Sequence, residues 1–449
     1  MHETHAGPAA LFLFTVFLLL AARFGALVER AKQPAVLGEL LAGVGVGALF
    51  LVPGFPWPEA MRTDGFLHLL AEFGVILLLF KAGLESNVAQ MRAVGARALL
   101  VALVGVFLPF FGGWATSTIL FADAPAILHV FIGATFTATS VGITARVFAD
   151  LAFSNAKEAK IVLGAAVIDD VLGLIVLAVV AGMAQNAGAV DPWAVGKTAL
   201  AAVGFLAGAV LLGSLIAKPI GTALSRVHEG VGMKMAFALF FCVAFAHAAS
   251  FAGLAPIVGA FAAGLVLDNV HFARFRRPEL SVKLRAWARA LRGSAHHPTA
   301  QAMEEEAERA EHKHVEDLVE GVAAFFVPIF FVYTGMQVDV RAFLDPGVLG
   351  TGLLLSAVAC FGKATAGWAA GRGSDPLIVG IGMVPRGEVG LIFAGLGKQL
   401  GVVNERTFAI LLVVIILTTL VTPPVLGWLI RRKQVRDTAR GNVIPLEAA

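Results

Sequence analysis

Charged residues are scarce in this chain. Only 14% of its 449 residues are Asp, Glu, Lys or Arg, whereas 58% are hydrophobic. A soluble domain is about a quarter charged and about half apolar, so this composition places the chain among membrane proteins. The formal net charge of +3 is too small to indicate a nucleic-acid partner.

Cysteine is nearly absent as well. Cys242 and Cys360 both lie in apolar runs, where a free thiol packs as a small hydrophobic side chain. No disulfide framework or zinc-ligand spacing is present, so we expect neither a structural metal nor a cofactor. The first ten residues also lack the basic region and the cleavage site of a signal peptide, and we expect the first apolar stretch to be a retained span.

Long apolar windows fill most of the sequence. A bilayer core needs about 20 apolar residues per helix, and thirteen windows of this kind predict an all-α polytopic membrane protein with about thirteen transmembrane helices. The windows are about 9–28, 35–53, 66–82, 95–120, 127–149, 160–184, 194–217, 232–252, 254–270, 321–338, 347–369, 375–398 and 407–430. Only Ala252-Gly253 lies at the junction of the eighth and ninth windows, so these two windows form either a tight hairpin or a bent pair.

The basic residues predict the orientation of the chain. They gather in every second loop, and the positive-inside rule then places the N-terminus outside and the C-terminus in the cytoplasm of a cell (inner) membrane. The loops of the predicted cytoplasmic side contain Arg30, Lys32, Lys81, Arg92, Arg97, Arg146, Lys157, Lys160, Lys218, Arg226, Lys234, Arg372 and the tail 431–449.

One long segment, 271–320, is not apolar. Its first half is basic and its second half is acidic, and we expect it to form one or two cytoplasmic helices. The basic half has apolar residues at helical spacing, so it either lies on anionic membrane lipid or is simply a solvated amphipathic helix.

Two adjacent carboxylates lie in the middle of the sixth window. Asp170 is about ten residues from the start of that window, or roughly 15 Å along a helix axis, which is mid-bilayer. Asp169 and Asp170 differ by about 100° around the helix and therefore face different neighbours. Because a charge at this depth is costly, such residues usually belong to ion or proton pathways, although two neutral, hydrogen-bonded aspartates are the alternative.

A cationic residue lies in the eleventh window at a depth similar to that of the two aspartates. Lys363 is too far from the nearer interface for its side chain to reach water easily. A buried lysine and a buried aspartate can stay charged together or exchange protons when another cation arrives. A static structural ion pair is the competing interpretation.

Two windows are interrupted by residues that break helices. The fifth contains a run of hydroxyls, which includes Thr137, Thr139 and Ser140, and the twelfth contains Pro385 between glycines. Arg386 and Glu388 place opposite charges at the second interruption. Interrupted helices at corresponding positions of two halves mark the binding site of inverted-repeat transporters, and the carboxylates, hydroxyls and freed carbonyls offer hard oxygen ligands for Na⁺, Li⁺, K⁺ or H⁺.

These motifs together resemble the monovalent cation:proton antiporter-2 family, which includes Kef-type and sodium/proton exchangers. The resemblance covers about residues 9–430. It is carried by Gln33-Pro34, Gly38-Glu39-Leu40 with Gly43, Gly74 to Phe80 with Gly83 and Glu85, Thr137 to Ser140, Ile168 to Asp170, Phe330-Phe331 with Gly335-Met336, and Pro385 to Val389.

The resemblance implies a fold and a domain division. It implies two inverted repeats with two broken crossing helices, within a transmembrane exchanger domain of residues 1–430. A core domain (spans about 95–184 and 347–430) would move against a dimerisation domain (about 9–82 and 232–338) of a homodimer, with 194–217 as linker. The 271–320 insert is longer than expected from the resemblance.

The resemblance also assigns roles to residues. Asp170 would be the main cation ligand and proton carrier, with Na⁺ bound at Asp170 and Asp169. Asp169 would pair with Lys363 and carry a second proton-linked charge. Thr137 and Ser140 would take part in ion and proton binding at the broken-helix crossing. Thr139 at that crossing, and Pro385, Arg386 and Glu388 of the second broken helix, would be structural or gating residues.

We therefore expect an electrogenic Na⁺(Li⁺)/H⁺ antiporter that works by alternating access and is not an enzyme. The potassium-efflux branch commonly has Gln in place of the first Asp and appends a nucleotide-binding domain, so the Asp pair and the short C-terminal tail favour sodium. A K⁺/H⁺ antiporter or a gated K⁺ efflux transporter of the Kef type is the main alternative. An intramembrane aspartyl protease is disfavoured because its two aspartates must face each other, and a sensor scaffold would leave Lys363 and the broken spans unexplained.

Overall fold

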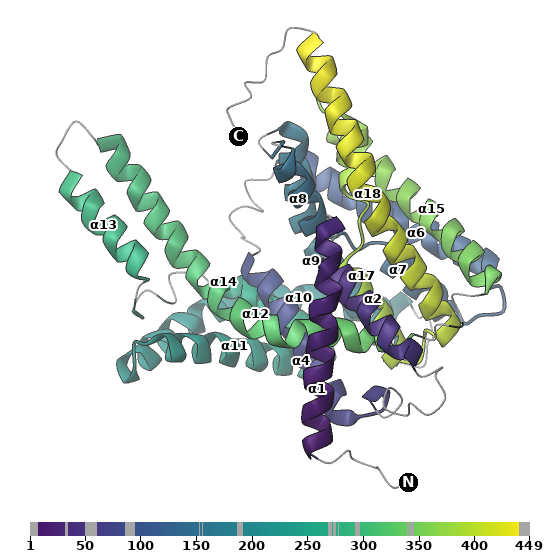
Figure 1. The fold of residues 1–449 in the computed structure, drawn as a ribbon, viewed down its shortest axis with the longest axis horizontal. Coiled ribbons are helices and arrows are strands. Elements are labelled where there is room, and N and C mark those ends of the chain that lie inside the picture. Colours follow the sequence, from purple (N-terminus) through teal and green to yellow (C-terminus); the bar gives the residue numbers. More distant parts are fainter. Residues whose placement is uncertain are drawn as a thin grey trace. The chain divides into compact units, whose positions relative to one another are not determined.

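The computed structural model describes residues 8–31, 35–49, 61–85, 95–151, 153–154, 156–185, 192–267, 272, 275–276, 278–291, 297–338, 341 and 345–439. Within these residues all regular structure is helical, as the apolar windows predict (Figure 1). In chain order the helices are α1 (Pro8–Gly25), η1 (Ala26–Ala31), α2 (Ala35–Ala48), α4 (Gly65–Glu85), α6 (Ala96–Leu120), α7 (Ala126–Thr135), α8 (Val141–Asp150), α9 (Lys157–Gln185), α10 (Pro192–Val227), α11 (Val231–Phe251), α12 (Pro256–Val266), α13 (Glu279–Leu291), α14 (His297–Met336), α15 (Pro346–Ala366), η5 (Gly367–Ala370), α16 (Pro376–Gly382), α17 (Glu388–Gln399) and α18 (Glu405–Ala439).

The protein is a multi-pass membrane protein. In the described part of the chain, seven helices are long and apolar enough to cross a bilayer, and an eighth is added if the bent α10 counts as one span. Four further apolar helices are shorter, namely Leu11–Gly25, Ala35–Ala48, Ala126–Thr135 and Pro256–Val266. The helical class is thereby confirmed, whereas the count of thirteen spans stays a prediction.

Helix α10 bends by 43° between Gly213 and Leu215. Pro219 has no N–H to donate to the carbonyl of Leu215, and its ring crowds that carbonyl, which is the usual cause of such a bend.

The chain divides into two compact units. The first consists of Met1–Leu67, Ala89–Ala199 and Phe331–Ala449. In it, α15 packs against both α6 and α18, and α6 also packs against α9 (Figure 1). Its core is apolar and includes Val101, Phe148, Val162, Ile378 and Met383, all nearly or completely removed from solvent.

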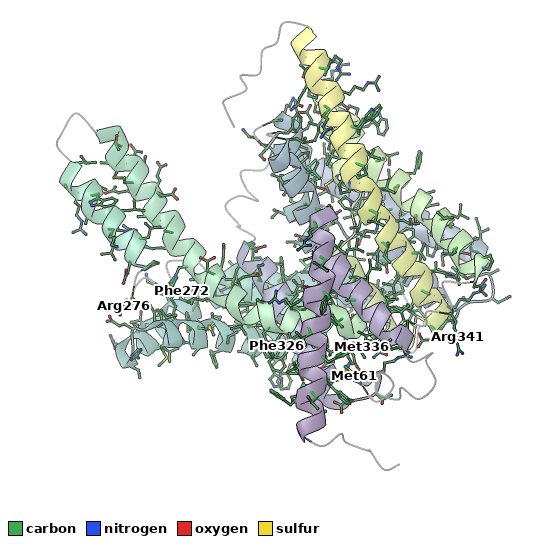
Figure 2. The ribbon with its side chains drawn as sticks, viewed as in Figure 1. Met61, Phe272, Arg276, Phe326, Met336 and Arg341 are labelled. Carbon is green, nitrogen blue, oxygen red and sulfur yellow. The ribbon has the colours of Figure 1, made fainter. Side chains whose placement is uncertain are left out.

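The second unit consists of His68–Val88 and Leu200–Phe330. Aromatic rings dominate its core: Phe237 lies 5.1 Å from Phe241 and 5.3 Å from Phe272, centroid to centroid. Phe272 and Arg276 are labelled in Figure 2, and the backbone N–H of Arg276 donates to the carbonyl of Glu229 at 2.8 Å.

The 271–320 segment forms two helices within the described residues. The first is α13, and the second is the start of α14, which continues without interruption into a membrane span that begins at His314. The Arg285 guanidinium joins the two helices through both oxygens of Glu311, at 3.1 and 3.2 Å. Buried Ser281 donates to the same carboxylate at 2.9 Å.

Glycines allow the closest helix contacts of the first unit. In α2, a methyl group built at Gly43 would collide with the carbonyl oxygen of Val332 in α14, and one at Gly335 would collide with the carbonyl of Leu40. Gly45 on the other face of α2 has nothing within 4 Å. The Gly43–Gly47 run is therefore a helix-packing motif and not a nucleotide-binding loop.

This contact yields a stability prediction with an internal control. Gly43→Ala should lower the thermal unfolding temperature of the purified protein, because overpacking of this kind typically costs about 1–3 kcal/mol. Gly45→Ala adds the same methyl group to the same helix without a collision and should leave that temperature unchanged or slightly raised. Equal effects of the two substitutions would contradict the packing of α2 on α14.

Candidate functional site

The first interrupted helix is the pair α7 and α8. Helix α7 ends at Thr135 and α8 begins at Val141, so Phe136–Ser140 is not helical. All five residues of this first break are buried. The hydroxyl of Thr137 donates to the carbonyl of Ala134 at 2.8 Å, which satisfies one of the carbonyls that the end of α7 leaves open.

The second interrupted helix is the pair α16 and α17. Helix α16 ends at Gly382 and α17 begins at Glu388, so Met383–Gly387 forms the second break. Pro385 cannot donate a backbone hydrogen bond and disfavours the helical conformation of the residue before it, which explains why the helix stops here. Glu388 is the first residue of α17, where the positive end of the helix dipole stabilises a negative charge. Its side chain lies outside the described residues.

The two breaks lie against each other. The backbone N–H of Ser140 donates to the carbonyl of Pro385 at 2.8 Å, and the hydroxyl of Thr139 donates to the carbonyl of Met383 at 3.2 Å. Just beyond the first break, the hydroxyl of Thr144 donates to the carbonyl of Gly382 at 2.7 Å. The first break therefore supplies donors for the carbonyls that the second break frees.

Gly387 permits this close approach. A methyl group built on it would lie 2.7 Å from the Ser140 hydroxyl oxygen, which is closer than two such atoms can come. A side chain at Gly387 would thus push the two breaks apart.

Arg386, in the second break, donates a hydrogen bond in the opposite direction, to a carbonyl of the first break. Its guanidinium is fully buried and donates to the carbonyl of Phe136 at 2.7 Å and to that of Val384 at 3.1 Å. It also lies 5.4 Å from the centroid of the Phe136 ring. A cation at these two carbonyls offsets the negative dipole ends of α7 and α16.

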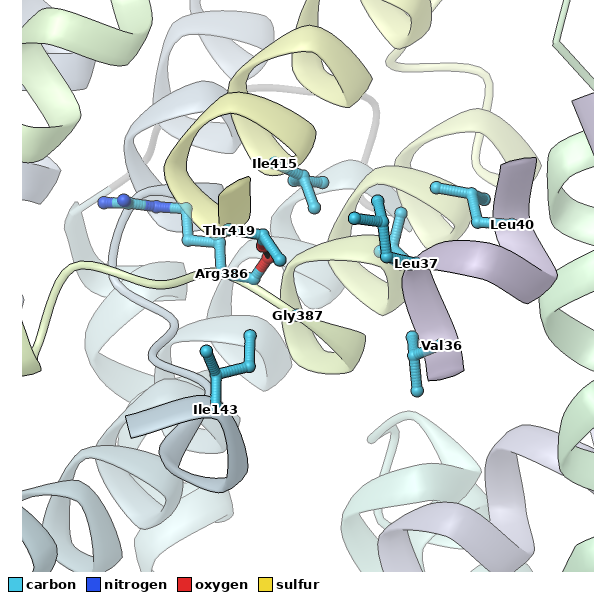
Figure 3. A pocket seen from close by; sticks show the side chains of 9 residues that line it. Val36, Leu37, Leu40, Ile143, Arg386, Gly387, Ile415 and Thr419 are labelled. Carbon is cyan, nitrogen blue, oxygen red and sulfur yellow. Dashed lines mark hydrogen bonds between the residues drawn. The ribbon is translucent and has the colours of Figure 1, made fainter. Parts of the chain in front are cut away.

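The Arg386 backbone is held separately from its side chain. The hydroxyl of Thr419 in α18 donates to the Arg386 carbonyl at 2.6 Å. A narrow apolar pocket adjoins Arg386, Gly387 and Thr419, and the Arg386 guanidinium points away from the pocket (Figure 3). The pocket is lined by Val36, Leu37, Leu40, Ile143, Arg386, Gly387, Leu391, Ile415 and Thr419.

Asp169 and Lys363 form a buried ion pair beside the breaks. The ammonium of Lys363 in α15 lies 3.1 Å from each carboxylate oxygen of Asp169 in α9. Neither side chain is exposed to solvent. The Thr139 hydroxyl is within hydrogen-bonding reach of the same carboxylate, and Arg386 interacts with it electrostatically.

Asp170 follows on α9 and is less enclosed than its neighbour. Its side chain is partly buried, whereas Asp169 is only 1% exposed. Asp170 interacts electrostatically with Lys363. The structure thus gathers two carboxylates and two cations, from α9, α15 and the second break, at the point where the broken helices meet.

The structure adds residues that the motifs did not single out. Phe136 contributes both a ring and a carbonyl to Arg386, and Thr419 fixes the Arg386 backbone. Gly105 in α6 lies next to the Lys363 ammonium, since a methyl group there would be 3.8 Å from it. Thr418, Thr419 and Thr422 are a visible signal in the sequence, because three hydroxyls share one apolar window. Phe136 and Gly105 carry no such signal.

The crossing is rich in oxygen atoms that could hold a hard cation. In the described ranges no three His, Cys, Asp or Glu side chains come together as a metal-binding group. The oxygens present are carboxylates, hydroxyls and main-chain carbonyls, which match alkali cations and protons.

Comparison with known proteins identifies the family. The model of the transmembrane sodium/hydrogen exchanger family matches residues 14–286 and 296–432. Only the short stretch 287–295, within the 271–320 segment, interrupts the match. The match confirms the resemblance seen in the motifs.

Individual relatives cover nearly the whole chain. The high-affinity Na⁺/H⁺ antiporter NhaS3 of Synechocystis is 35% identical over 94% of this chain and 91% of its own length. The Na⁺/H⁺-K⁺ antiporter GerN of Bacillus cereus is 32% identical over 93% of this chain and 96% of its own length.

A solved structure shares the fold. The sodium proton antiporter MjNhaP1 of Methanocaldococcus jannaschii superposes with a TM-score of 0.66 at 16% identity and covers 94% of this chain and 98% of its own. Together with the family match, these similarities show that the chain belongs to the sodium/hydrogen exchanger family, whose members are multi-pass cation/proton antiporters and not enzymes.

Proposed function

We propose that this protein is an electrogenic Na⁺(Li⁺)/H⁺ antiporter that works by alternating access. The observation that carries the proposal is the buried Asp169–Lys363 pair, with Asp170 next to it, at the crossing of two broken helices. NhaS3 is described as a high-affinity Na⁺/H⁺ antiporter and GerN as a Na⁺/H⁺-K⁺ antiporter, which supports sodium as the cation.

Competition at the carboxylates provides the coupling. Asp170 binds either the cation or a proton and is the main carrier of both. A cation that also reaches Asp169 displaces the Lys363 ammonium, and a buried lysine without a counter-ion releases its proton. Loading the cation therefore expels protons, and this difference in affinity couples the two fluxes.

The proposed domain division follows the breaks. The core domain comprises spans about 95–184 and 347–430, and it moves against a dimerisation domain of spans about 9–82 and 232–338, with 194–217 as linker. Thirteen spans in two inverted repeats place one break in each repeat. The alternation of basic loops supports an outside N-terminus and a cytoplasmic C-terminus in the inner membrane, and we propose a homodimer.

Potassium exchange is the second candidate. GerN is described as a Na⁺/H⁺-K⁺ antiporter, and it is 32% identical to this chain. A proton-flux assay in proteoliposomes, with Na⁺, Li⁺ and K⁺ titrated at a clamped membrane potential, separates K⁺/H⁺ exchange or gated K⁺ efflux from the sodium mechanism.

The first prediction concerns Asp170. Asp170→Asn should abolish Na⁺-driven proton flux in proteoliposomes, because an amide can neither carry the proton nor supply the charge that holds the cation. Asp317→Asn, at an exposed position of α14, is the matched control and should retain the flux of the unmodified protein. Normal flux in the Asp170 variant would sink the proposed mechanism.

A second prediction separates stability from coupling at Lys363. Lys363→Ala leaves the Asp169 carboxylate buried without its partner, and loss of one member of a buried pair costs about 3–5 kcal/mol. The thermal unfolding temperature should therefore fall, and any remaining exchange should be electroneutral.

The double variant Asp169→Asn with Lys363→Met removes both charges and controls for folding. It should recover most of the lost thermal stability. An unchanged charge stoichiometry in Lys363→Ala, measured from the reversal potential of the flux, would show that Lys363 carries no transported charge.

A third prediction concerns a contact that the proposed domain motion must break. Lys398, at the end of α17, donates to the carbonyl of Gln337 at 2.6 Å and pairs with Glu405 at 2.8 Å. Gln337 in turn donates to the Arg62 carbonyl at 3.0 Å, close to buried Met61 and Met336, which Figure 2 labels. In the proposed division, Lys398 belongs to the core domain and Gln337 to the dimerisation domain.

Lys398→Gln should shift the protein toward the opposite-facing state. A hydrogen bond to a charged group contributes about 1.5–3 kcal/mol, so the population should change by roughly tenfold or more. Hydrogen–deuterium exchange of 331–338 should rise. Arg406→Gln breaks a 3.1 Å ion pair that links α18 to Asp345, the residue just before α15, and should leave this segment unaffected. The same exchange in both variants would mean that Lys398 does not link the domains.

A further inference from the structure

Two cationic side chains lie beside a tight loop of the first unit, and the loop itself contains Arg372. Gly371 and Gly373 adopt positive φ angles of 74° and 83° in the loop between η5 and α16. The Lys157 ammonium, at the start of α9, donates to the carbonyls of Arg372 and Gly373 at 3.4 and 3.2 Å. The Arg97 guanidinium also lies beside the loop, since a methyl group on Gly371 would be 3.9 Å from its Nε.

The carboxylates near this loop are already engaged. Glu158 is buried, accepts the backbone N–H of Asp375 at 2.9 Å and lies 3.6 Å from the Lys433 ammonium. The Asp375 side chain pairs with Arg436 at 3.1 Å. Asp437 pairs with Lys433, also at 3.1 Å.

Two arginines at this loop are not neutralised in the same way. Arg97 and Arg372 are both exposed, and within the described residues neither has a carboxylate partner. The loop therefore presents uncompensated positive charge to its surroundings.

The patch lies at the edge of the bilayer. Arg97 is the second residue of the span Ala96–Leu120, and Trp368 lies in the last turn of the span Pro346–Ala370. Trp368 is 60% exposed, and Leu100 and Phe361, further along the same two spans, are 51% and 73% exposed. Tryptophan is typical of the membrane–water interface, whereas exposed Leu and Phe within a span face the lipid chains.

We propose that the Arg97, Arg372 and Trp368 patch binds the headgroup of an anionic phospholipid in the leaflet that the basic loops predict to be cytoplasmic. Guanidinium groups recognise phosphate oxygens with paired hydrogen bonds, the acyl chains run along the exposed Leu100 and Phe361, and Lys157 holds the loop in place. The loop leads directly into α16, the first half of the second broken helix, so the headgroup anchors that helix to the lipid surface.

The test uses the full chain in detergent with a defined lipid. Phosphatidylglycerol is titrated against phosphatidylcholine, bound lipid is counted by native mass spectrometry, and the thermal unfolding temperature is recorded in parallel. The unmodified protein should retain phosphatidylglycerol selectively and be stabilised by it. The double variant Arg97→Gln with Arg372→Gln should bind it roughly 30-fold more weakly, because each basic residue near an anionic surface contributes about fivefold.

Two further variants test whether a loss of phosphatidylglycerol binding is specific to the patch. Lys218→Gln with Arg226→Gln removes the same number of exposed basic residues from α10 and should weaken binding much less than the Arg97 and Arg372 double variant does. Arg97→Lys with Arg372→Lys keeps the charge but loses the paired hydrogen bonds of the guanidinium groups, so its affinity should lie between those of the unmodified protein and the double glutamine variant. The unfolding temperature in phosphatidylcholine alone shows whether each variant is folded.

Several outcomes would overturn the proposal. Unchanged phosphatidylglycerol binding in the Arg97 and Arg372 double variant would exclude the patch. An equal loss in the α10 variant would show a diffuse charge effect and not a site. Equal stabilisation by inorganic phosphate at matched concentration would assign the patch to a soluble phosphate and not to a lipid.

Discussion

The Asp169–Lys363 ion pair constrains the rest of the site because both side chains are wholly removed from solvent. Two charges taken out of water lose several kcal/mol of hydration each, and their mutual attraction repays this loss only with good geometry and additional hydrogen bonds. The two 3.1 Å contacts between the Lys363 ammonium and the Asp169 oxygens supply those bonds, whereas the single proton of the Thr139 hydroxyl is donated to the Met383 carbonyl. A pair of apolar residues would stabilise the helices at least as well, so stability alone does not explain why the charges are present.

The broken helices also remove polar groups from water, in this case main-chain carbonyls and N–H groups. Each break frees carbonyls and N–H groups in a region where water is scarce, and each must find a partner. The Thr139, Ser140 and Thr144 donors satisfy carbonyls of the second interrupted helix, while Arg386 satisfies the carbonyl of Phe136 in the first break. Neither break is satisfied without the other, which ties the crossing together and holds Asp169 next to it.

The sequence predicted which residues form this site better than it predicted which of them contact one another. The hydroxyl run, Pro385 and the costly Asp169, Asp170 and Lys363 each stand out within the apolar windows, because each violates the rules for an apolar helix. Their pairing is not local: Thr139 and Met383 are 244 positions apart, and only the tertiary fold brings them together.

Span counting from the sequence also had a physical limit. The fifth and twelfth windows contain enough apolar residues to span the bilayer, yet each is two short helices around a break. Hydropathy averages over the break and cannot detect it, whereas Pro385 and the glycines can. The continuity of α14 from His297 into the span that begins at His314 has no hydropathy signal either, because its first half is acidic and solvated.

The charges at the crossing give a reason why exchange on the proposed mechanism should be electrogenic. Arg386 is a guanidinium and stays protonated at neutral pH, so it is a fixed positive charge, whereas Lys363 can titrate. With a cation bound, both aspartates are ionised and Lys363 is neutral, and the four side chains and the cation sum to no net charge. With protons bound, Asp170 is neutral while Asp169, Lys363 and Arg386 are charged, which leaves one positive charge. The proton-loaded site thus carries one more charge than the cation-loaded site, and the membrane potential acts on that difference as the core domain moves.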